Sequence, residues 1–160
     1  MDLSQSTALT MGQIVETVRS LDGALVVDPA PGDPDVPELA WGDVFFYYAP
    51  DGRLPRNIQP YGTIITKNYP DDTSSGLDHA ARWRVNIRVG RETLHELTGP
   101  GPVDATAADP AATDVLLPHP VYGPAGWVCV INPGARTAAT VLQLLRDAHQ
   151  AARIRVERRG

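Results

Sequence analysis

A histidine held between two prolines is the first candidate for chemistry. His119 follows Pro118 and precedes Pro120, and Tyr122 comes shortly after it. Proline restricts the backbone, and a residue that precedes proline is driven into extended geometry. A rigid loop of this kind suits a general base or an oriented hydrogen-bond donor. The alternative is a histidine packed at a sheet edge and hydrogen-bonded to the backbone.

Polar and apolar residues alternate along the segment 83–89, which predicts a strand with two different faces. One face carries Trp83, Val85, Ile87 and Val89. The other carries Arg84, Asn86 and Arg88. A guanidinium group binds carboxylate or phosphate, and an asparagine amide orients a carbonyl group. We therefore predict a ligand pocket on the polar face, with Arg84 holding an anionic group; the alternative is a solvated sheet face.

An aromatic segment, 41–48, supplies candidate walls for this pocket. Strand alternation puts Phe45 and Tyr47 on one face and Phe46 and Tyr48 on the other. One pair must be exposed, as a ligand or partner surface, or covered by a second layer. The predicted ligand-binding residues are Tyr48, Arg84, Asn86, Arg88, Tyr122 and Trp41.

Lys67 is the only lysine among fourteen basic residues, and it follows a predicted strand. A buried lysine can form an imine or supply a cation, so Lys67 joins His119 as a catalytic candidate. The alternative is a genome that uses arginine in place of lysine. Cys129 stands between Val128 and Val130 and is expected to fill the core instead of acting as a nucleophile.

Metal and cofactor signatures are not readable in the sequence. The acids at Asp71 and Asp72, with Asp43 and Asp78, lack the spacing of a calcium loop and are interpreted as turn residues. The four histidines, His79, His95, His119 and His149, are scattered, and no glycine-rich nucleotide loop is present. We expect no metal and no cofactor.

Composition bounds the class of protein. The 160 residues suit one domain, with residues 1–9 disordered and residues 100–113 a loop. A net charge of −5 opposes nucleic-acid binding. The sequence contains no apolar run that could cross a membrane and no signal peptide, so we expect a cytoplasmic location.

The elements predict an α+β fold. Thr10 and Gln13 form a capping box that begins a helix, which ends at Gly23. Strands are predicted at 24–27, 41–48, 61–67, 83–89, 114–117 and 127–131, and helices at about 91–97 and 137–156. Because the strands run consecutively, we predict a single antiparallel sheet packed on the N- and C-terminal helices.

Four segments also support a resemblance: "WGDVFFYYAPDGRLP", "TIITKNYPDD", "WRVNIRVGRE" and "LLPHPVYGPAGWVCVINP". With these the chain, from about Met11, resembles an uncharacterised actinobacterial domain family that is similar to YjbR/MmcQ-like proteins. The C-terminal third resembles the Trp-bearing strand, turn and closing helix of that group. The resemblance implies a CyaY-like α+β fold, and a DNA-binding label that the acidic charge of this chain opposes.

The sequence thus leaves several functions open. The first is a small-molecule-binding domain, or a cofactor-free enzyme of bacterial secondary metabolism, with its pocket on the polar sheet face. The second is a protein-interaction or homodimerisation module that uses the aromatic strand. DNA binding is the third.

Overall fold

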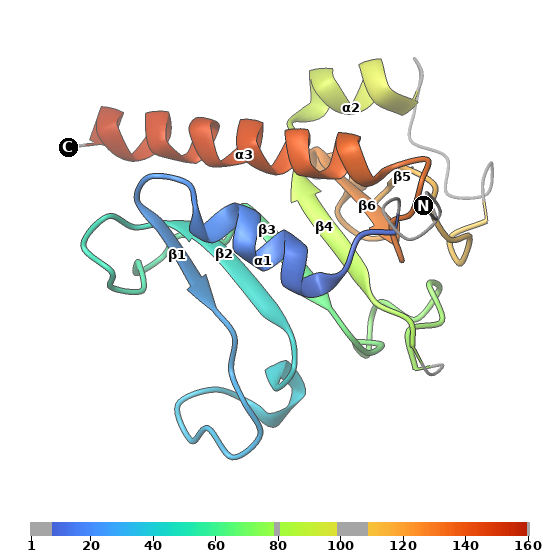
Figure 1. Ribbon diagram of the computed structural model, residues 1–160, viewed down its shortest axis with the longest axis horizontal. Helices are drawn as coiled ribbons and strands as arrows, with labels where there is room; N and C mark the ends of the chain where they lie inside the picture. The colour runs from blue at the N-terminus through green and yellow to red at the C-terminus, as the bar shows by residue number, and fades with distance from the viewer. Residues whose placement is uncertain (1–7, 79–80, 99–108, 160) are drawn as a thin grey trace, which may run out of the picture.

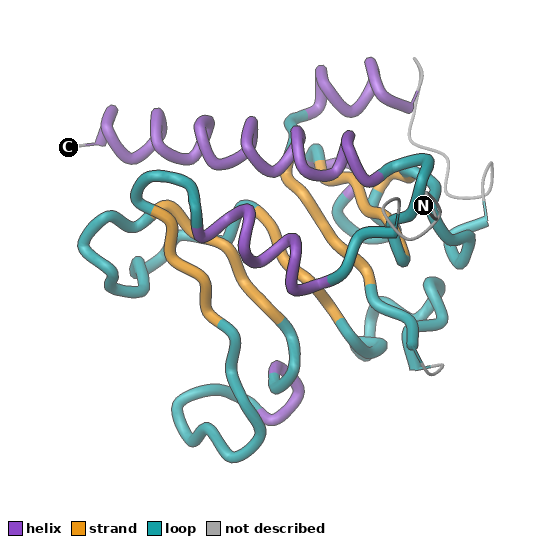
Figure 2. Tube along the Cα trace, viewed as in Figure 1, coloured by secondary structure: helices purple, strands orange, loops and turns teal. Residues whose placement is uncertain are grey.

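The computed structural model describes residues 8–78, 81–98 and 109–159. Within these residues, six strands form one antiparallel sheet in the order β1-β2-β3-β4-β6-β5. The described part also contains three α-helices, of which α1 and α3 lie on the same side of the sheet (Figures 1 and 2). The prediction of an α+β fold with a single antiparallel sheet on N- and C-terminal helices is confirmed.

The element bounds lie within a few residues of the predicted segments, except for the strand predicted at 114–117. The helices are α1 (Met11–Arg19), α2 (Arg91–Thr98) and α3 (Ala138–Arg159), with short 3-10 turns η2 (Glu38–Ala40) and η3 (Gly123–Ala125). The strands are β1 (Ala24–Val27), β2 (Val44–Tyr48), β3 (Gly62–Ile65), β4 (Arg84–Arg88), β5 (Leu117–Pro118) and β6 (Trp127–Ile131).

The back face of the sheet, defined as the face that α1 and α3 cover, holds the main core. Val85 and Ile87 of β4 are fully buried there, against Ile14 of α1 and Leu145 of α3. The first helix begins as predicted: the Thr10 side chain accepts a hydrogen bond from the Gln13 amide, and the Gln13 side chain accepts one from the Thr10 amide.

The front face is the opposite side of the sheet, and it carries the polar residues of β4. Cross-strand pairing aligns Phe45 with Thr63, Thr63 with Asn86, and Asn86 with Cys129. Residues opposite one another in a ladder share a face. The front face therefore carries a row of side chains that crosses the centre of the sheet.

The predicted strand at 114–117 is wrong in extent, because only Leu117 and Pro118 form a strand beside β6, and before them Thr113 makes an isolated bridge to Ile131. Asp114 instead adopts a positive φ of 54° and closes the N-terminal turn of α3. Its carboxylate accepts hydrogen bonds from the amides of Gly134, Arg136 and Thr137. An aspartate held in this way satisfies the helix terminus and stops the strand from starting earlier.

The predictions of disorder at residues 1–9 and of a loop at residues 100–113 fall partly on residues that the structure does not describe. The predictions for residues 1–7 and 100–108 lie outside the described residues. Leu9, within the predicted disordered segment, is buried in the core, and its amide donates to the Pro133 carbonyl. Within the part of the chain that the structure describes, no helix is both long and apolar enough to span a bilayer.

Candidate functional site

A pocket of about 730 Å³ opens on the front face. This volume lies within the range of small-molecule sites. Aromatic side chains contribute much of its lining: Phe45, Tyr47, Tyr69, Tyr122 and Trp127. Its buried polar members are Arg84, Asn86 and His119, which are 1%, 4% and 3% exposed. The pocket thus combines apolar walls with a small set of fixed polar groups.

Arg84 is the centre of a hydrogen-bonded network below the pocket. Its Nε donates to Asn86 Oδ1 at 2.8 Å, and its Nη1 donates to Ser75 Oγ at 2.8 Å and to Asp72 Oδ1 at 3.1 Å. Nη2 pairs with the second oxygen of Asp72. The Asn86 amide in turn donates to Thr63 Oγ1 at 2.9 Å. The ion pair between Arg84 and Asp72, in which two nitrogens contact two oxygens, is the strong, oriented form of an arginine–carboxylate contact.

The loop that supplies Asp72 and Ser75 is fixed to the front face by its own apolar cluster. Leu77 packs with Ile65 and Ile131, and Tyr69 packs against this cluster. Asn68 Oδ1 accepts a hydrogen bond from the Leu77 amide at 2.8 Å. The loop therefore holds the carboxylate in place over the sheet, because packing and backbone bonds both restrain it.

The Asp72 carboxylate is ionised in the folded protein. Burial acts to raise the pKa of Asp72, but the hydrogen bonds and the charge of Arg84 outweigh burial and hold the pKa below its usual value. The Arg84 charge is therefore neutralised within the chain. The predicted role of Arg84 as a clamp for an anionic ligand is corrected: its anion is Asp72.

His119 is held rigidly by its turn. Its amide donates to the Trp127 carbonyl, and its carbonyl accepts from the Gly123 amide. Gly126, with φ of 92°, closes the turn where a Cβ atom would lie 2.7 Å from the Gly90 backbone. The prolines and these bonds leave the imidazole a fixed position at the edge of the pocket.

Both nitrogens of His119 have defined neighbours. Nδ1 accepts hydrogen bonds from the amides of Val121 and Tyr122, each at 3.0 Å. Nδ1 is therefore unprotonated, and the proton of the neutral ring sits on Nε2. Nε2 lies 3.2 Å from Arg84 Nη2, and Asp72 Oδ2 is 3.7 Å away.

This arrangement opposes the predicted general-base role of His119. To accept a proton at Nε2, the ring would first need a proton on Nδ1, where two backbone N–H groups already point. Burial, together with the charge of Arg84, also lowers the pKa of His119 to about 4, although Asp72 acts in the other direction. His119 is neutral at pH 7 and presents an N–H donor.

Arg88 is a cation of the pocket that forms no ion pair with another described residue, although the exposed Asp71 also lines the pocket. It lines the pocket and is exposed, and its guanidinium makes no hydrogen bond or ion pair among those residues. Tyr122 is 52% exposed, and its ring centroid lies 4.9 Å from that of His119. These two side chains are the accessible members of the predicted set.

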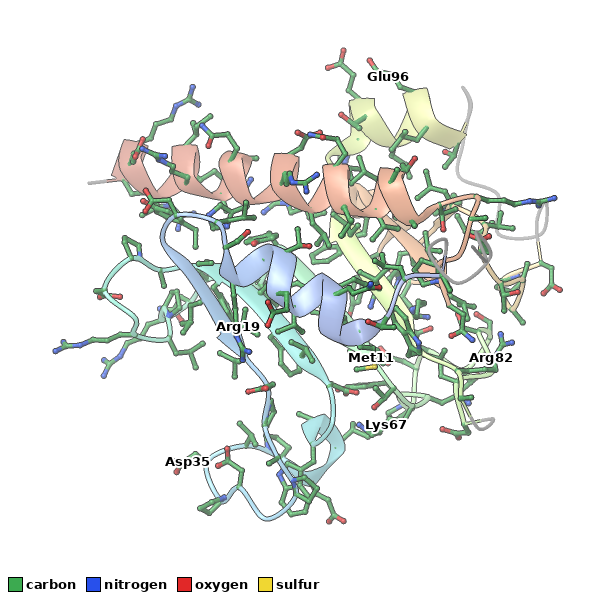
Figure 3. All side chains as sticks on the ribbon, in the orientation of Figure 1. Met11, Arg19, Asp35, Lys67, Arg82 and Glu96 are labelled. Atoms are coloured by element: carbon green, nitrogen blue, oxygen red, sulfur yellow. The ribbon has the colours of Figure 1, made fainter. Side chains whose placement is uncertain are left out.

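Three predicted site residues lie outside the pocket. Tyr48 faces the back of the sheet, where its ring meets His149 edge-on with centroids 5.5 Å apart. Lys67 pairs with the buried Asp43 at 3.1 Å and donates to the carbonyls of Leu39, within η2, and of Trp41, just after it. Figure 3 shows Lys67 beside this turn. Trp41 donates its indole N–H to the Asp33 carbonyl. Lys67 and Trp41 thus secure the 33–43 loop.

The sequence prediction leaves the turn acid Asp72 out of the site and includes Tyr48 of β2, which lies on the other face. Phe45 and Tyr47, not Tyr48, line the pocket. The alternation identified both faces, but not which of them the helices cover. Asp72 lies in a turn whose composition gives no sign of its pairing with Arg84.

The remaining predictions concern Cys129 and metal sites. Cys129 is buried, and burial raises the pKa of its thiol to about 12, as expected of a core residue. Among the residues that the structure describes, no group of three or more His, Cys, Asp or Glu side chains is placed to hold a metal ion. His79 lies outside those residues.

Comparison with known proteins gives one positive result. A protein-family model described as "Family of unknown function (DUF6194)" matches residues 9–160 of the chain. No curated protein and no solved structure is significantly similar to the chain.

Proposed function

The chain belongs to the DUF6194 family, and we propose that it binds a small, flat organic molecule in the front-face pocket. The observation that carries the proposal is the pocket itself: a concave volume of about 730 Å³ whose aromatic walls surround buried, fixed polar groups. Sites for small molecules have this composition, in which apolar area gives affinity and a few polar atoms give orientation.

The ligand that fits best carries an anionic group. Arg88 is exposed at the pocket and is not engaged by another described side chain, whereas the charge of Arg84 is already neutralised by Asp72. A guanidinium group pairs with a carboxylate through two parallel hydrogen bonds. An aromatic ring of the ligand would pack against Tyr47, Tyr122 and Trp127, since offset and edge-on ring contacts are favourable.

Binding is better supported than catalysis. Lys67 donates to two backbone carbonyls and pairs with Asp43, so its amine is not offered to a substrate in the pocket. The Nδ1 atom of His119 is taken by two amides, which opposes proton transfer by this ring. The YjbR-like detail of the fold, the actinobacterial origin and a role in secondary metabolism stay predictions.

The test uses benzoate as the probe and ¹H–¹⁵N NMR shift changes as the measurement. Fragments of this size bind with a Kd of roughly millimolar, so the titration extends through that range. Benzoate should shift amides around the pocket of the native chain. Arg88→Ala and Tyr122→Ala should each weaken binding about fivefold or more, because they remove the counter-charge and one aromatic wall.

Matched controls separate pocket contacts from general effects. Arg146→Ala removes an exposed arginine of α3, and Leu54→Ala removes an apolar side chain that is 58% exposed; neither lines the pocket. Both controls should bind benzoate as the native chain does. Equal binding by all four variants, or shifts confined to another surface, would contradict the proposal.

A further inference from the structure

Two hydrogen-bond donors converge at one edge of the pocket. His119 Nε2 and Arg84 Nη2 are 3.2 Å apart. Arginine nitrogens only donate, and Nε2 carries the proton of the neutral ring because Nδ1 accepts from two amides. The contact therefore joins two donors and is not a hydrogen bond. Each N–H needs an acceptor, and the stability of a buried donor depends on finding one.

The residues that the structure describes satisfy only one of these donors. Asp72 Oδ2 accepts from Arg84 Nη2 but lies 3.7 Å from His119 Nε2, beyond hydrogen-bonding distance. Both Arg84 and His119 line the pocket. We therefore expect the acceptor for Nε2–H to be an atom of a bound ligand that enters from the pocket.

We infer that this donor pair, His119 Nε2–H and Arg84 Nη2–H, receives a neutral carbonyl oxygen of the bound molecule. The inference rests on the proposed function and names a second contact of the same ligand. A carbonyl oxygen has two lone pairs and can accept from both N–H groups at once. Imidazole in its neutral form is an established donor to carbonyl oxygen in protein sites.

Charge selects a carbonyl over a carboxylate at this position. Asp72 holds a full negative charge beside Nε2, and it already balances Arg84. A second carboxylate would face Asp72 across a few ångströms of partly buried space, where like charges repel strongly. A neutral carbonyl group avoids this repulsion. The anionic group of the ligand is left to Arg88, at the other end of β4.

The strand sets the spacing between the two contacts. Arg84 and Arg88 are the first and last residues of β4, on the same face, which corresponds to about 13 Å along the strand. Between them Asn86 is engaged by Arg84 and Thr63. The ligand class is therefore an elongated, flat molecule with a carbonyl group toward His119 and an acid toward Arg88.

One substitution of His119 removes the Nε2–H donor but keeps the acceptor that holds the turn. In His119→Asn the amide oxygen can replace Nδ1 as the acceptor for the Val121 and Tyr122 amides, as asparagine does in turns, but nothing replaces Nε2–H. The probes are benzamide, which has a neutral carbonyl group, and benzoate. We expect His119→Asn to raise the Kd for benzamide roughly tenfold. Benzoate, held by Arg88, should change less than twofold.

The outcomes distinguish the inference from the proposed function. If His119→Asn binds benzamide as tightly as the native chain while Tyr122→Ala weakens it, the pocket is correct and the donor pair is not. If the native chain binds benzoate but not benzamide, selection of a neutral carbonyl group is contradicted. If the native chain binds neither probe, both proposals are contradicted.

The tautomer of His119 provides a further test, and its first measurement needs no ligand. Imidazole ¹⁵N chemical shifts distinguish a protonated from an unprotonated ring nitrogen. At pH 7 the native chain should show His119 with Nε2 protonated and Nδ1 unprotonated, and saturating benzamide should move the Nε2 signal. A proton on Nδ1 would overturn the inference, whatever the probes do.

Discussion

Two buried histidines of the described chain lie on opposite faces of one sheet and are bonded in opposite ways. On the back face, the His149 Nε2–H donates to the Asp22 carbonyl at 2.7 Å, and Nδ1 accepts from the Tyr61 hydroxyl at 2.9 Å. Each nitrogen of His149 has a complementary partner. On the front face, His119 Nδ1 has two donors, and Nε2 faces a third.

The difference separates a structural group from a binding group. A buried polar side chain that is fully satisfied joins elements together and leaves nothing to offer a ligand. His149 does this by joining α3 to Tyr61, which immediately precedes β3, and to the turn before β1. His119 is fixed equally well, but its Nε2–H donor lacks an acceptor among the described residues and lies at a pocket. The front cluster, defined here as Asp72, Ser75, Arg84, Asn86 and His119, is charged and open; the back pair, Tyr61 and His149, is neutral and closed.

The largest effect is expected from a substitution that breaks the charge balance of the front cluster. Asp72→Ala leaves the Arg84 guanidinium, 1% exposed, without its counter-charge. Loss of one partner of a buried ion pair typically lowers the free energy of unfolding by about 3–5 kcal/mol. Urea denaturation measures this. Asp71→Ala, an exposed neighbour in the same loop, is the control and should change stability by less than about 0.5 kcal/mol. Equal effects would show that the pair is not buried.

The next effect is a pH dependence that belongs to the front face. Burial and Arg84 lower the pKa of His119 from 6.5 to about 4. The unfolded chain therefore takes up the proton first, so the stabilising contribution is complete above pH 6.5 and is lost as pH falls from 6.5 to 4. The loss is on the order of 3 kcal/mol.

His119→Asn isolates this contribution, because asparagine does not titrate. The difference in unfolding free energy between the native chain and the variant should shrink as pH falls from 6.5 to 4, measured by urea denaturation at a series of pH values. Parallel pH profiles of the two proteins would contradict the neutral state assigned to His119.

The smallest of the three effects tests the closed back pair. His149→Leu keeps the volume but leaves the Tyr61 hydroxyl and the Asp22 carbonyl without their partner. Each unsatisfied buried group is costly, so we expect a loss of about 2 kcal/mol in unfolding free energy. Benzoate affinity should stay unchanged, since His149 is on the other face. His95→Leu, on the exposed surface of α2, is the control. A ligand-binding defect in His149→Leu would remove the distinction between the two faces.

The sequence predicted the side-chain directions on β4, because alternation within one strand is a local property. Arg84 and Asn86 do share a face, and they lie in one pocket. The same rule could not choose between Tyr47 and Tyr48, because the choice depends on how β2 is aligned with β3 and β4. That register is set by contacts between segments far apart in the chain.

The ion-pair partners of Lys67 and Arg84 also could not be predicted from the sequence. Lys67 is paired with Asp43 and Arg84 with Asp72, whereas the sequence predicts both acids to be turn residues. Turn acids look alike in sequence whether they are solvated or cover a buried guanidinium. His149 was missed for a related reason: it stands within the apolar stripe of α3, and its two partners come from Tyr61 and Asp22.

The two edge strands of the sheet, β5 and β1, limit how copies of the protein could associate. β5 is only two residues long, and Pro118 has no N–H with which to bond a further strand. β1, at the other edge, is four residues long and is soon followed by Pro29 and Pro31. Short edge strands and proline protect a sheet from adding strands of another molecule and from aggregation. An assembly of this protein would therefore have to be built from side-chain contacts instead of a continuous intermolecular sheet.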